Sequence, residues 1–293
     1  MTALAKLLGF IVRLFPLSLV QRAGVIFGLF LFYVIPVRKK IALYNLNLAF
    51  PDKDNAWKKN VLKECYINLG INIFELFYLP KVNKKMSDEL IKVNNAEIFE
   101  EGMNKGKGII LMSAHFSNWE MFAYAFPYFG LQNLNIVAKT QASEGLNKYI
   151  MELRQSSGNS IINLGLGIKE AFTKIKEGEI VSFLIDQSAH SQYAEYIKLF
   201  GISVPAFPGA VKIALRTGCE LIFAYGIRKN FKYEIFVEKI NTTAYDNKKD
   251  SDVNALVQLV NKKLEDVIRK YPGQWLWFHK RFKDARFDEV NND

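Results

Sequence analysis

The chain has 293 residues, enough to bury a sizeable core as one large α/β domain or two small ones. Lys and Arg outnumber Asp and Glu by 39 to 29, and the net charge of +10 indicates an anionic partner such as nucleic acid, lipid headgroups or an acidic carrier protein. The 50% hydrophobic content and 23 phenylalanines favour lipid, and no zinc-finger or RNA-recognition pattern supports nucleic acid. The cysteines, Cys65 and Cys219, occur singly in apolar contexts that are typical of reduced core residues.

Residues 3–37 form the least globular part of the chain, and we expect residues 1–40 to anchor the protein to a membrane. Within them, residues 23–37 are uncharged and lie between Arg22 and a basic run that begins at Arg38. A perpendicular helical span needs about 20 apolar residues, so three forms are open: a short span, an interfacial or re-entrant segment, and a helical hairpin buried on the domain. No small-residue cleavage site follows, which argues against a removed signal peptide. The basic flanks favour an anionic cytoplasmic membrane surface.

Residues 41–293 are expected to form a single domain, because no internal repeat, low-complexity linker or break in composition divides them. From Lys39 to about Val93 the apolar residues recur with helical spacing, in one stripe ended by Pro51 and a longer stripe after it. Both stripes are typical of core-facing helices.

After this helical region, short apolar runs alternate with helical segments. The expected strands are 108–112, 134–138, 161–162, 180–185 and 220–227. The expected helices are 119–129, 143–155, 168–176, 208–215 and 253–268. Strand–helix repeats with short connections predict an α/β fold with a mostly parallel central sheet flanked by helices. The alternating residues 233–240 predict an antiparallel strand that forms a hairpin at the sheet edge.

The candidate chemistry lies in one stretch after the first of these strands, Ser113-Ala-His-Phe-Ser-Asn-Trp-Glu120. In open α/β sheets, ligands bind outside the carboxyl ends of strands. A histidine there can take a proton from an attacking hydroxyl, and a carboxylate can orient its ring and stabilise the imidazolium. Five residues span about 140° around a helix, so His115 and Glu120 can meet only if His115 lies in the turn and Glu120 in the first helical turn.

Other interpretations of these residues are open at this point. A helical metal pair needs ligands four residues apart, so no metal site is predicted. Ser117 and Glu120 also fit a capping box, in which Ser117 caps the helix and Glu120 reaches back to the backbone. His115 would then be an ordinary loop histidine.

The spacing His-x-x-x-x-Glu after an apolar strand resembles the signature of the glycerolipid/lysophospholipid acyltransferase superfamily. The longer pattern is similar to its branch of lipid A biosynthesis (lauroyl/myristoyl) acyltransferases, in the same order and over almost the whole chain. The further matching stretches are Asn45-Leu-Asn-Leu-Ala-Phe-Pro51, Arg154 with Gly158, Phe183-Leu-Ile-Asp-Gln187, residues 208–218, and Gln274-Trp-Leu-Trp-Phe-His-Lys-Arg-Phe-Lys283.

This resemblance implies acyl transfer from a thioester donor to a hydroxyl of a membrane glycolipid of the lipid A precursor type. His115 would be the general base, Glu120 would orient its ring, and no acyl-enzyme would form. The donor would be an acyl carrier protein or coenzyme A thioester, and no metal or tightly bound cofactor is expected. The implied location is the bacterial inner membrane, with the catalytic domain facing the cytoplasm and with no nucleic-acid partner.

Two further residues have both a functional and a structural interpretation. The resemblance implies that Arg154 lies near His115 and stabilises the thioester oxygen or binds an acceptor phosphate; otherwise it is an exposed cation at a helix end. Asp186 follows the strand at 180–185, where it is either a second carboxylate of the site or a cap for the next turn.

Three more residues are candidates for substrate or oxyanion contacts: Asn118, Lys280 and Arg281. The segment that carries the last two, with Trp275 and Trp277, is either an interfacial belt of aromatic and cationic side chains or a tail that contacts a headgroup.

Rival functions differ in acceptor or in chemistry. A lysophospholipid or phospholipid acyltransferase of the same superfamily would differ in its acceptor, and a non-catalytic lipid-binding relative would keep the fold and the basic surface. A lipid hydrolase would need a nucleophile beside His115, and the absence of a Gly-x-Ser-x-Gly sequence argues against a serine lipase.

Overall fold

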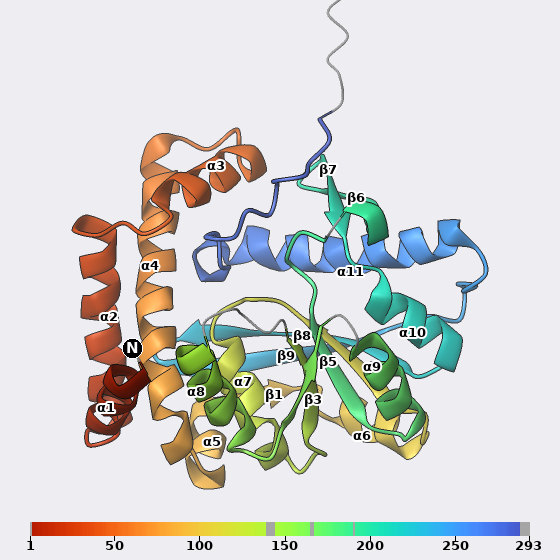
Figure 1. Ribbon diagram of the computed structural model, residues 1–293. Helices are drawn as coiled ribbons and strands as arrows, with labels where there is room; N and C mark the ends of the chain where they lie inside the picture. Colours follow the sequence, from red (N-terminus) through yellow and green to blue (C-terminus); the bar gives the residue numbers. More distant parts are fainter. Residues whose placement is uncertain (1, 139–143, 165–166, 190, 288–293) are drawn as a thin grey trace, which may run out of the picture.

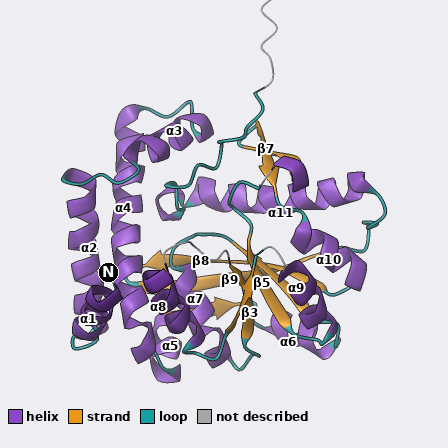
Figure 2. Ribbon diagram, in the orientation of Figure 1, coloured by secondary structure: helices purple, strands orange, loops and turns teal. Residues whose placement is uncertain are grey.

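The computed structural model describes residues 2–138, 144–164, 167–189 and 191–287. Its centre is a seven-stranded sheet in the order β1-β9-β8-β2-β5-β3-β4 (Figures 1 and 2). The strands are β1 (Ile91–Asn94), β2 (Ile109–Ser113), β3 (Leu134–Ala138), β4 (Ser160–Asn163), β5 (Ile180–Leu184), β8 (Glu220–Lys229) and β9 (Lys232–Ile240). All neighbouring pairs are parallel except the β8–β9 hairpin, so the predicted α/β class with a mostly parallel sheet is confirmed.

The edge of the sheet differs from the prediction. The hairpin strand β9 is antiparallel to β8 as expected, but β1 pairs with its other side, so β9 is not an edge strand. The four residues of β1 follow directly on a helix, and they are too few to stand out from the helical spacing that precedes them. A separate two-stranded sheet, β6 (Glu195–Leu199) with β7 (Ile202–Ala206), was also not predicted.

Helices cover both faces of the sheet. Because side chains alternate along a strand, Ile110 packs in one buried cluster with residues of α9 (Gly167–Lys176), α10 (Gly209–Thr217) and α11 (Asp250–Lys270). Its neighbours Ile109 and Leu111 pack on the other face, with residues of α6 (Glu97–Asn104), α7 (Trp119–Ala125) and η2 (Phe126–Phe129).

The remaining helices are α1 (Thr2–Val12), α2 (Leu17–Tyr33), α3 (Lys39–Ala49), α4 (Asn55–Tyr78), α5 (Lys84–Leu90) and α8 (Glu144–Gln155), with the short 3₁₀ turns η1 (Leu79–Lys81), η3 (Ser191–Tyr193) and η4 (Pro272–Gln274). The expected first residue of α8, Ser143, lies outside the described residues. The predicted helix at 119–129 divides into α7 and η2, because Pro127 cannot continue the α-helical hydrogen bonds.

The N-terminal helices lie against α4 at the side of the sheet domain (Figure 1). Helix α2 crosses α4 closely, and a Cβ atom on Gly28 would be 2.6 Å from the Cα of Ile67. The uncharged run continues past the end of α2 at Tyr33, and none of the described helices combines the length and hydropathy needed to cross a membrane. The division into an anchor at 1–40 and a domain at 41–293 stays a prediction.

Helices α1 and α2 and the turn between them carry many exposed apolar side chains, among them Leu4, Phe10, Leu14 and Ile26. Both cysteines are buried and unpaired, as the sequence predicted.

Candidate active site

The site is built at the carboxyl ends of two neighbouring strands. Strands β2 and β5 are parallel, and their last residues, Ser113 and Leu184, are register partners. The backbone N–H of Ile185 continues the pairing by donating to the Ser113 carbonyl at 2.9 Å. His115 and Asp186 each follow their strand by two residues, so the sheet itself brings them side by side.

The imidazole of His115 is hydrogen-bonded to Asp186. Its Nδ1 lies 2.8 Å from Oδ1 of the carboxylate, while the backbone N–H of His115 donates to Oδ2 at 3.0 Å. The indole N–H of Trp275 donates to the same Oδ2 at 2.8 Å. Since an ionised carboxylate can only accept a hydrogen bond, the neutral ring carries its proton on Nδ1, donates it to Asp186 and presents a lone pair at Nε2.

The environment keeps Asp186 ionised although only 2% of the residue is exposed. Burial alone would raise the pKa of this carboxyl, but the charge of His115 and the hydrogen bonds from the His115 ring, the Trp275 indole and the His115 backbone lower the pKa to about 2. A buried carboxylate that stays charged can orient His115 and stabilise the imidazolium formed when Nε2 takes up a proton.

Glu120 lies in the first turn of α7 as the spacing required, yet it does not pair with His115. Between these two residues, which the structure describes in full, there is no hydrogen bond. Instead, Glu120 accepts two bonds from Arg154, from Nε at 2.8 Å and Nη2 at 2.5 Å, and a third from the Trp119 indole at 3.0 Å. The Trp119 ring also meets the His115 ring edge-on, with 4.9 Å between the ring centroids. Trp119 therefore links His115 to Glu120.

Arg154, near the end of α8, is therefore held by a bidentate ion pair rather than exposed. Burial opposes its charge, but the hydrogen bonds and charge of Glu120 raise its pKa. Both Arg154 and Glu120 line the same cavity as His115. The contact described for the third guanidinium nitrogen, Nη1, is a long one of 3.9 Å to the Met151 sulfur.

The capping-box interpretation is wrong. The N-cap of α7 is Asn118, whose Oδ1 accepts from the Met121 N–H at 3.0 Å. Ser117 instead has a left-handed backbone with φ of 52°, and its hydroxyl is buried without a partner among the described residues. Asn118 is fully buried, and its amide donates to Glu75 at 2.5 Å, so both ends of this substrate-contact candidate are used inside the protein.

Two residues that the sequence did not single out complete the site. The amide nitrogen of Gln187 lies 3.2 Å from Nε2 of His115 and 3.4 Å from Nε2 of His279. The two imidazoles are 5.1 Å apart. Burial is the main cause that lowers the pKa of His279 to about 4, and the nearby charges of His115 and Arg38 add to it, while Asp186 acts in the opposite direction. The ring of His279 is therefore neutral at pH 7.

Helix α3 holds the backbone that carries His279. The side-chain amide of Asn45 donates to the carbonyls of Trp277 at 2.8 Å and His279 at 2.6 Å, and Arg38 donates to the Phe278 carbonyl at 3.2 Å. The stretch that begins at Asn45 therefore contributes to the site from 70 residues upstream of His115. Order in the sequence gave no indication of this contact.

The C-terminal segment is not an interfacial aromatic belt, because Trp275 and Trp277 are core residues. Arg281 is also buried and donates from Nη1 to the Pro205 carbonyl at 2.9 Å; burial lowers its pKa to about 10, against the attraction of Asp186. Lys280 is exposed and lines a small outer groove with Lys40 and Lys283.

A cavity of about 1270 Å³ extends from His115 into the molecule. Polar groups gather at the histidine: Glu120, Arg154, Gln187 and His279. The lining also includes the charged side chains of Glu195, Lys212 and Arg216. The apolar residues are more numerous and include Phe99, Phe122, Phe126, Phe129, Leu134 and Ile136. In the described part of the chain, no group of three or more His, Cys, Asp or Glu side chains could hold a metal ion.

The sequence model of the bacterial lipid A biosynthesis acyltransferase family matches residues 1–284. The chain belongs to this family. One relative of this acyltransferase is a lipid A biosynthesis palmitoleoyltransferase of Escherichia coli K12, which is 22% identical over 84% of this chain and 79% of its own length. A lipid A biosynthesis lauroyltransferase of the same organism is 22% identical over 92% of this chain and 86% of its own length. A myristoyltransferase of the same organism is 19% identical over 86% of this chain and 77% of its own length. The acyltransferase activity and the predicted family are thus confirmed.

Proposed function

We propose that this acyltransferase moves a fatty acyl chain from a thioester donor to a hydroxyl of a lipid A precursor at the bacterial inner membrane, with His115 as the general base and Asp186 as its partner. The observation that carries the proposal is the His115–Asp186 pair, whose imidazole lines a largely apolar cavity. The family and the names of its relatives support the acceptor class.

The step needs one proton acceptor near the acceptor hydroxyl. The hydroxyl oxygen attacks the thioester carbonyl carbon while its proton passes to Nε2 of His115, and Asp186 stabilises the resulting imidazolium. The C–S bond then breaks, and the imidazolium proton passes to the leaving sulfur, which gives the thiol and the new ester. Such base catalysis contributes roughly 10²–10⁴-fold to the rate.

The incoming hydroxyl takes the place of the Gln187 amide. That amide lies 3.2 Å from Nε2 of His115, which is the distance at which a hydroxyl would donate to the same lone pair.

Glu120 has a supporting role in this proposal. It does not orient the imidazole but fixes the guanidinium of Arg154 through two hydrogen bonds. The remaining nitrogen, Nη1, is then available to stabilise the negative oxygen that develops on the thioester carbonyl. This assignment keeps the His-x-x-x-x-Glu spacing but divides the roles between two different pairs of residues.

The apolar surface of α1 and α2 supports membrane association without a span. Exposed side chains such as Phe10, Leu14 and Ile26 would enter the headgroup boundary, and the chain's net charge of +10 would attract the anionic cytoplasmic leaflet. Lipid acceptor and active site would then meet at the water–bilayer boundary.

The test is product analysis by mass spectrometry with the purified protein. A lipid A precursor and a lysophospholipid are offered as acceptors, each with acyl carrier protein and coenzyme A thioesters, and His115→Ala is the matched control. We expect acylation of the lipid A precursor by the wild type, and no product from His115→Ala, which still binds vesicles. Acylation of the lysophospholipid alone would show that the acceptor is a phospholipid and not a lipid A precursor. Near-normal turnover by His115→Ala would contradict the mechanism.

A further inference from the structure

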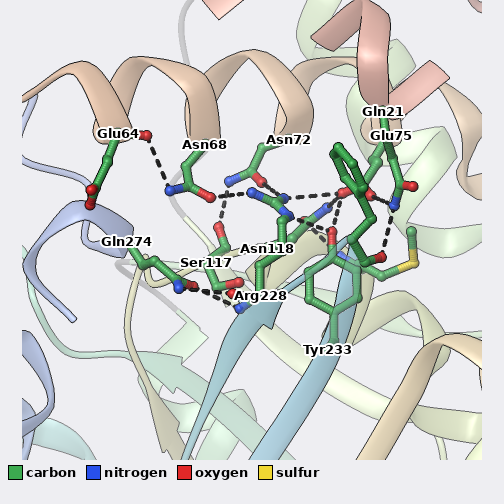
Figure 3. A network of polar contacts seen from close by, with 12 residues as sticks. Gln21, Glu64, Asn68, Asn72, Glu75, Ser117, Asn118, Arg228, Tyr233 and Gln274 are labelled. Carbon is green, nitrogen blue, oxygen red and sulfur yellow. Dashed lines mark hydrogen bonds and ion pairs between the residues drawn. The ribbon is translucent and has the colours of Figure 1, made fainter. Parts of the chain in front are cut away.

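A buried polar cluster lies beside Ser117 and Asn118, in the turn that follows His115 (Figure 3). Its centre is Glu75 of α4, a fully buried carboxylate that is paired with Arg228 of β8 at 3.2 Å. The same carboxylate accepts hydrogen bonds from Gln21 of α2 at 2.7 Å, from Asn118 at 2.5 Å and from the Tyr233 hydroxyl. We call these residues, together with Asn72, the Glu75 cluster.

Two members of the Glu75 cluster contact the catalytic turn directly. Asn118, which is the N-cap of α7, is held through its amide by Glu75. Asn72 lies one helical turn before Glu75 on α4, and its amide donates to the Ser117 carbonyl at 2.5 Å. The Oδ1 atom of Asn72 accepts from Nη2 of Arg228 at 2.5 Å, so the ion pair fixes which way the Asn72 amide points.

The other side of the turn is held by the C-terminal segment. The Ser117 N–H donates to the Gln274 carbonyl at 2.7 Å, and the Leu276 N–H donates to the His115 carbonyl at 3.0 Å. The Gln274 side chain in turn bonds both backbone groups of Arg228, at 2.7 Å and 3.0 Å. Arg228 therefore supports both sides of the turn, with its side chain on one and its backbone on the other.

The turn needs this support because its backbone is unfavourable. Ser117 is not a glycine, yet its φ of 52° lies in the left-handed region, which L residues adopt only when the surroundings impose it. Its own hydroxyl, buried and unpartnered among the described residues, does not cap the helix. Both backbone groups of Ser117 are instead bound from outside, by Asn72 and Gln274.

We propose that Asn72, Glu75 and Arg228 are positioning residues of the acyl transfer: by holding Ser117 and Asn118, they keep His115 in register with Asp186 and the cavity. The inference rests on the proposed role of His115. A buried ion pair is a poor means of stabilising a fold, since apolar residues of the same volume often do so equally well. Its location beneath the strained turn at Ser117 points to geometry rather than to stability. A displacement of about 1 Å at a catalytic group can reduce the rate about 100-fold.

The test is Asn72→Asp, which keeps the shape and the acceptor for Arg228 but removes the donor to the Ser117 carbonyl. We expect kcat to fall about 10- to 100-fold while KM for both substrates stays within about threefold. Asn72→Ala, which removes the donor without adding a charge, should give the same result.

The matched control is Asn261→Asp. Asn261 is an equally buried asparagine on a long helix, and its described bond, to the Val257 carbonyl at 2.9 Å, stays within α11. We expect a lower melting temperature for this variant but an unchanged kcat when it is assayed in the folded state. Wild-type kcat in folded Asn72→Asp or Asn72→Ala, or an equal loss in the control, would overturn the positioning role. Activity in His115→Ala would instead refute the proposed function, whatever Asn72 does.

Discussion

At the scale of single residues, the proposed reaction depends on the protonation state of two neighbouring imidazoles. The Gln187 amide presents its hydrogens to Nε2 of both His115 and His279, so both rings offer lone pairs there. His115 has a carboxylate behind it, but His279 does not, and its pKa of about 4 keeps it neutral. We therefore expect His115, rather than His279, to take up the proton in the proposed reaction.

The low pKa of His279 makes the stability of the protein depend on pH. An unfolded histidine takes up its proton near pH 6.5, whereas folded His279 does so near pH 4, so acid favours the unfolded chain between these values. The free energy of unfolding should fall by up to about 2 kcal/mol between pH 7 and pH 5 from this residue alone. We expect His279→Gln to reduce that slope in urea unfolding. If the variant keeps the full wild-type dependence of the unfolding free energy on pH, His279 is not its source.

The place of His115 at a strand end was predictable from the sequence, and Asp186 was a candidate for the same site, but the pairing of these two residues was not predicted. Glu120 is near in sequence, and Asp186 is near in space because β5 lies beside β2 in the sheet. Strand order is a long-range property that local spacing does not contain. The same limit applies to Gln187 and His279, although both lie in stretches that resemble the family.

At the scale of elements, the close crossing of α2 and α4 connects the apolar N-terminal surface to the site. Glycines at the crossing, Gly24 and Gly28 on α2 and Gly70 on α4, allow backbone contact between the helices. One turn of α2 away from Gly24, Gln21 donates to Glu75. Helix α4 thus has α2 on one side and the turn at Ser117 on the other.

This crossing predicts a sharp sensitivity to side-chain size. Gly28→Leu should lower the free energy of unfolding by about 2 kcal/mol or more, because its Cβ alone would be 2.6 Å from the Cα of Ile67. Ile26→Leu, on the exposed side of the same helix, should stay within about 0.5 kcal/mol of the wild type. Urea unfolding in detergent measures both, and equal stability of the two variants would exclude a tight crossing.

The buried strands of the central sheet and the long amphipathic helices were predictable, whereas β1 and the β6–β7 pair were not. Buried strands such as β2 and β5 and long amphipathic helices such as α11 follow directly from their apolar spacing. The four-residue β1 and the β6–β7 pair depend on partners that are distant in sequence. The turn at Ser117 follows from the Glu75 cluster rather than from its own capping side chain.

At the scale of the whole molecule, apolar exposure is concentrated on the N-terminal helices. Phe10 is 58% exposed and Ile26 is 69% exposed. Such a surface fits a protein that lies in the headgroup layer, with its apolar side chains inserted by about 5–10 Å.

We therefore expect Phe10→Glu to weaken binding to anionic vesicles at least tenfold, since inserting a large apolar side chain contributes about 1.5–3 kcal/mol. Asn247→Glu adds the same charge to the exposed loop before α11, at the far end of the molecule from α1 (Figure 1), and should bind nearly as the wild type does. Co-sedimentation with vesicles provides the comparison. Equal losses in both variants would show that charge alone is responsible.

If His115 and Asp186 act as one unit, a double-mutant cycle of kcat/KM will reveal it. Residues that act as a unit give losses that do not add. We predict that Asp186→Ala alone lowers kcat/KM strongly, while the same change made in His115→Ala lowers it no further. Additive losses from the two substitutions would contradict the account.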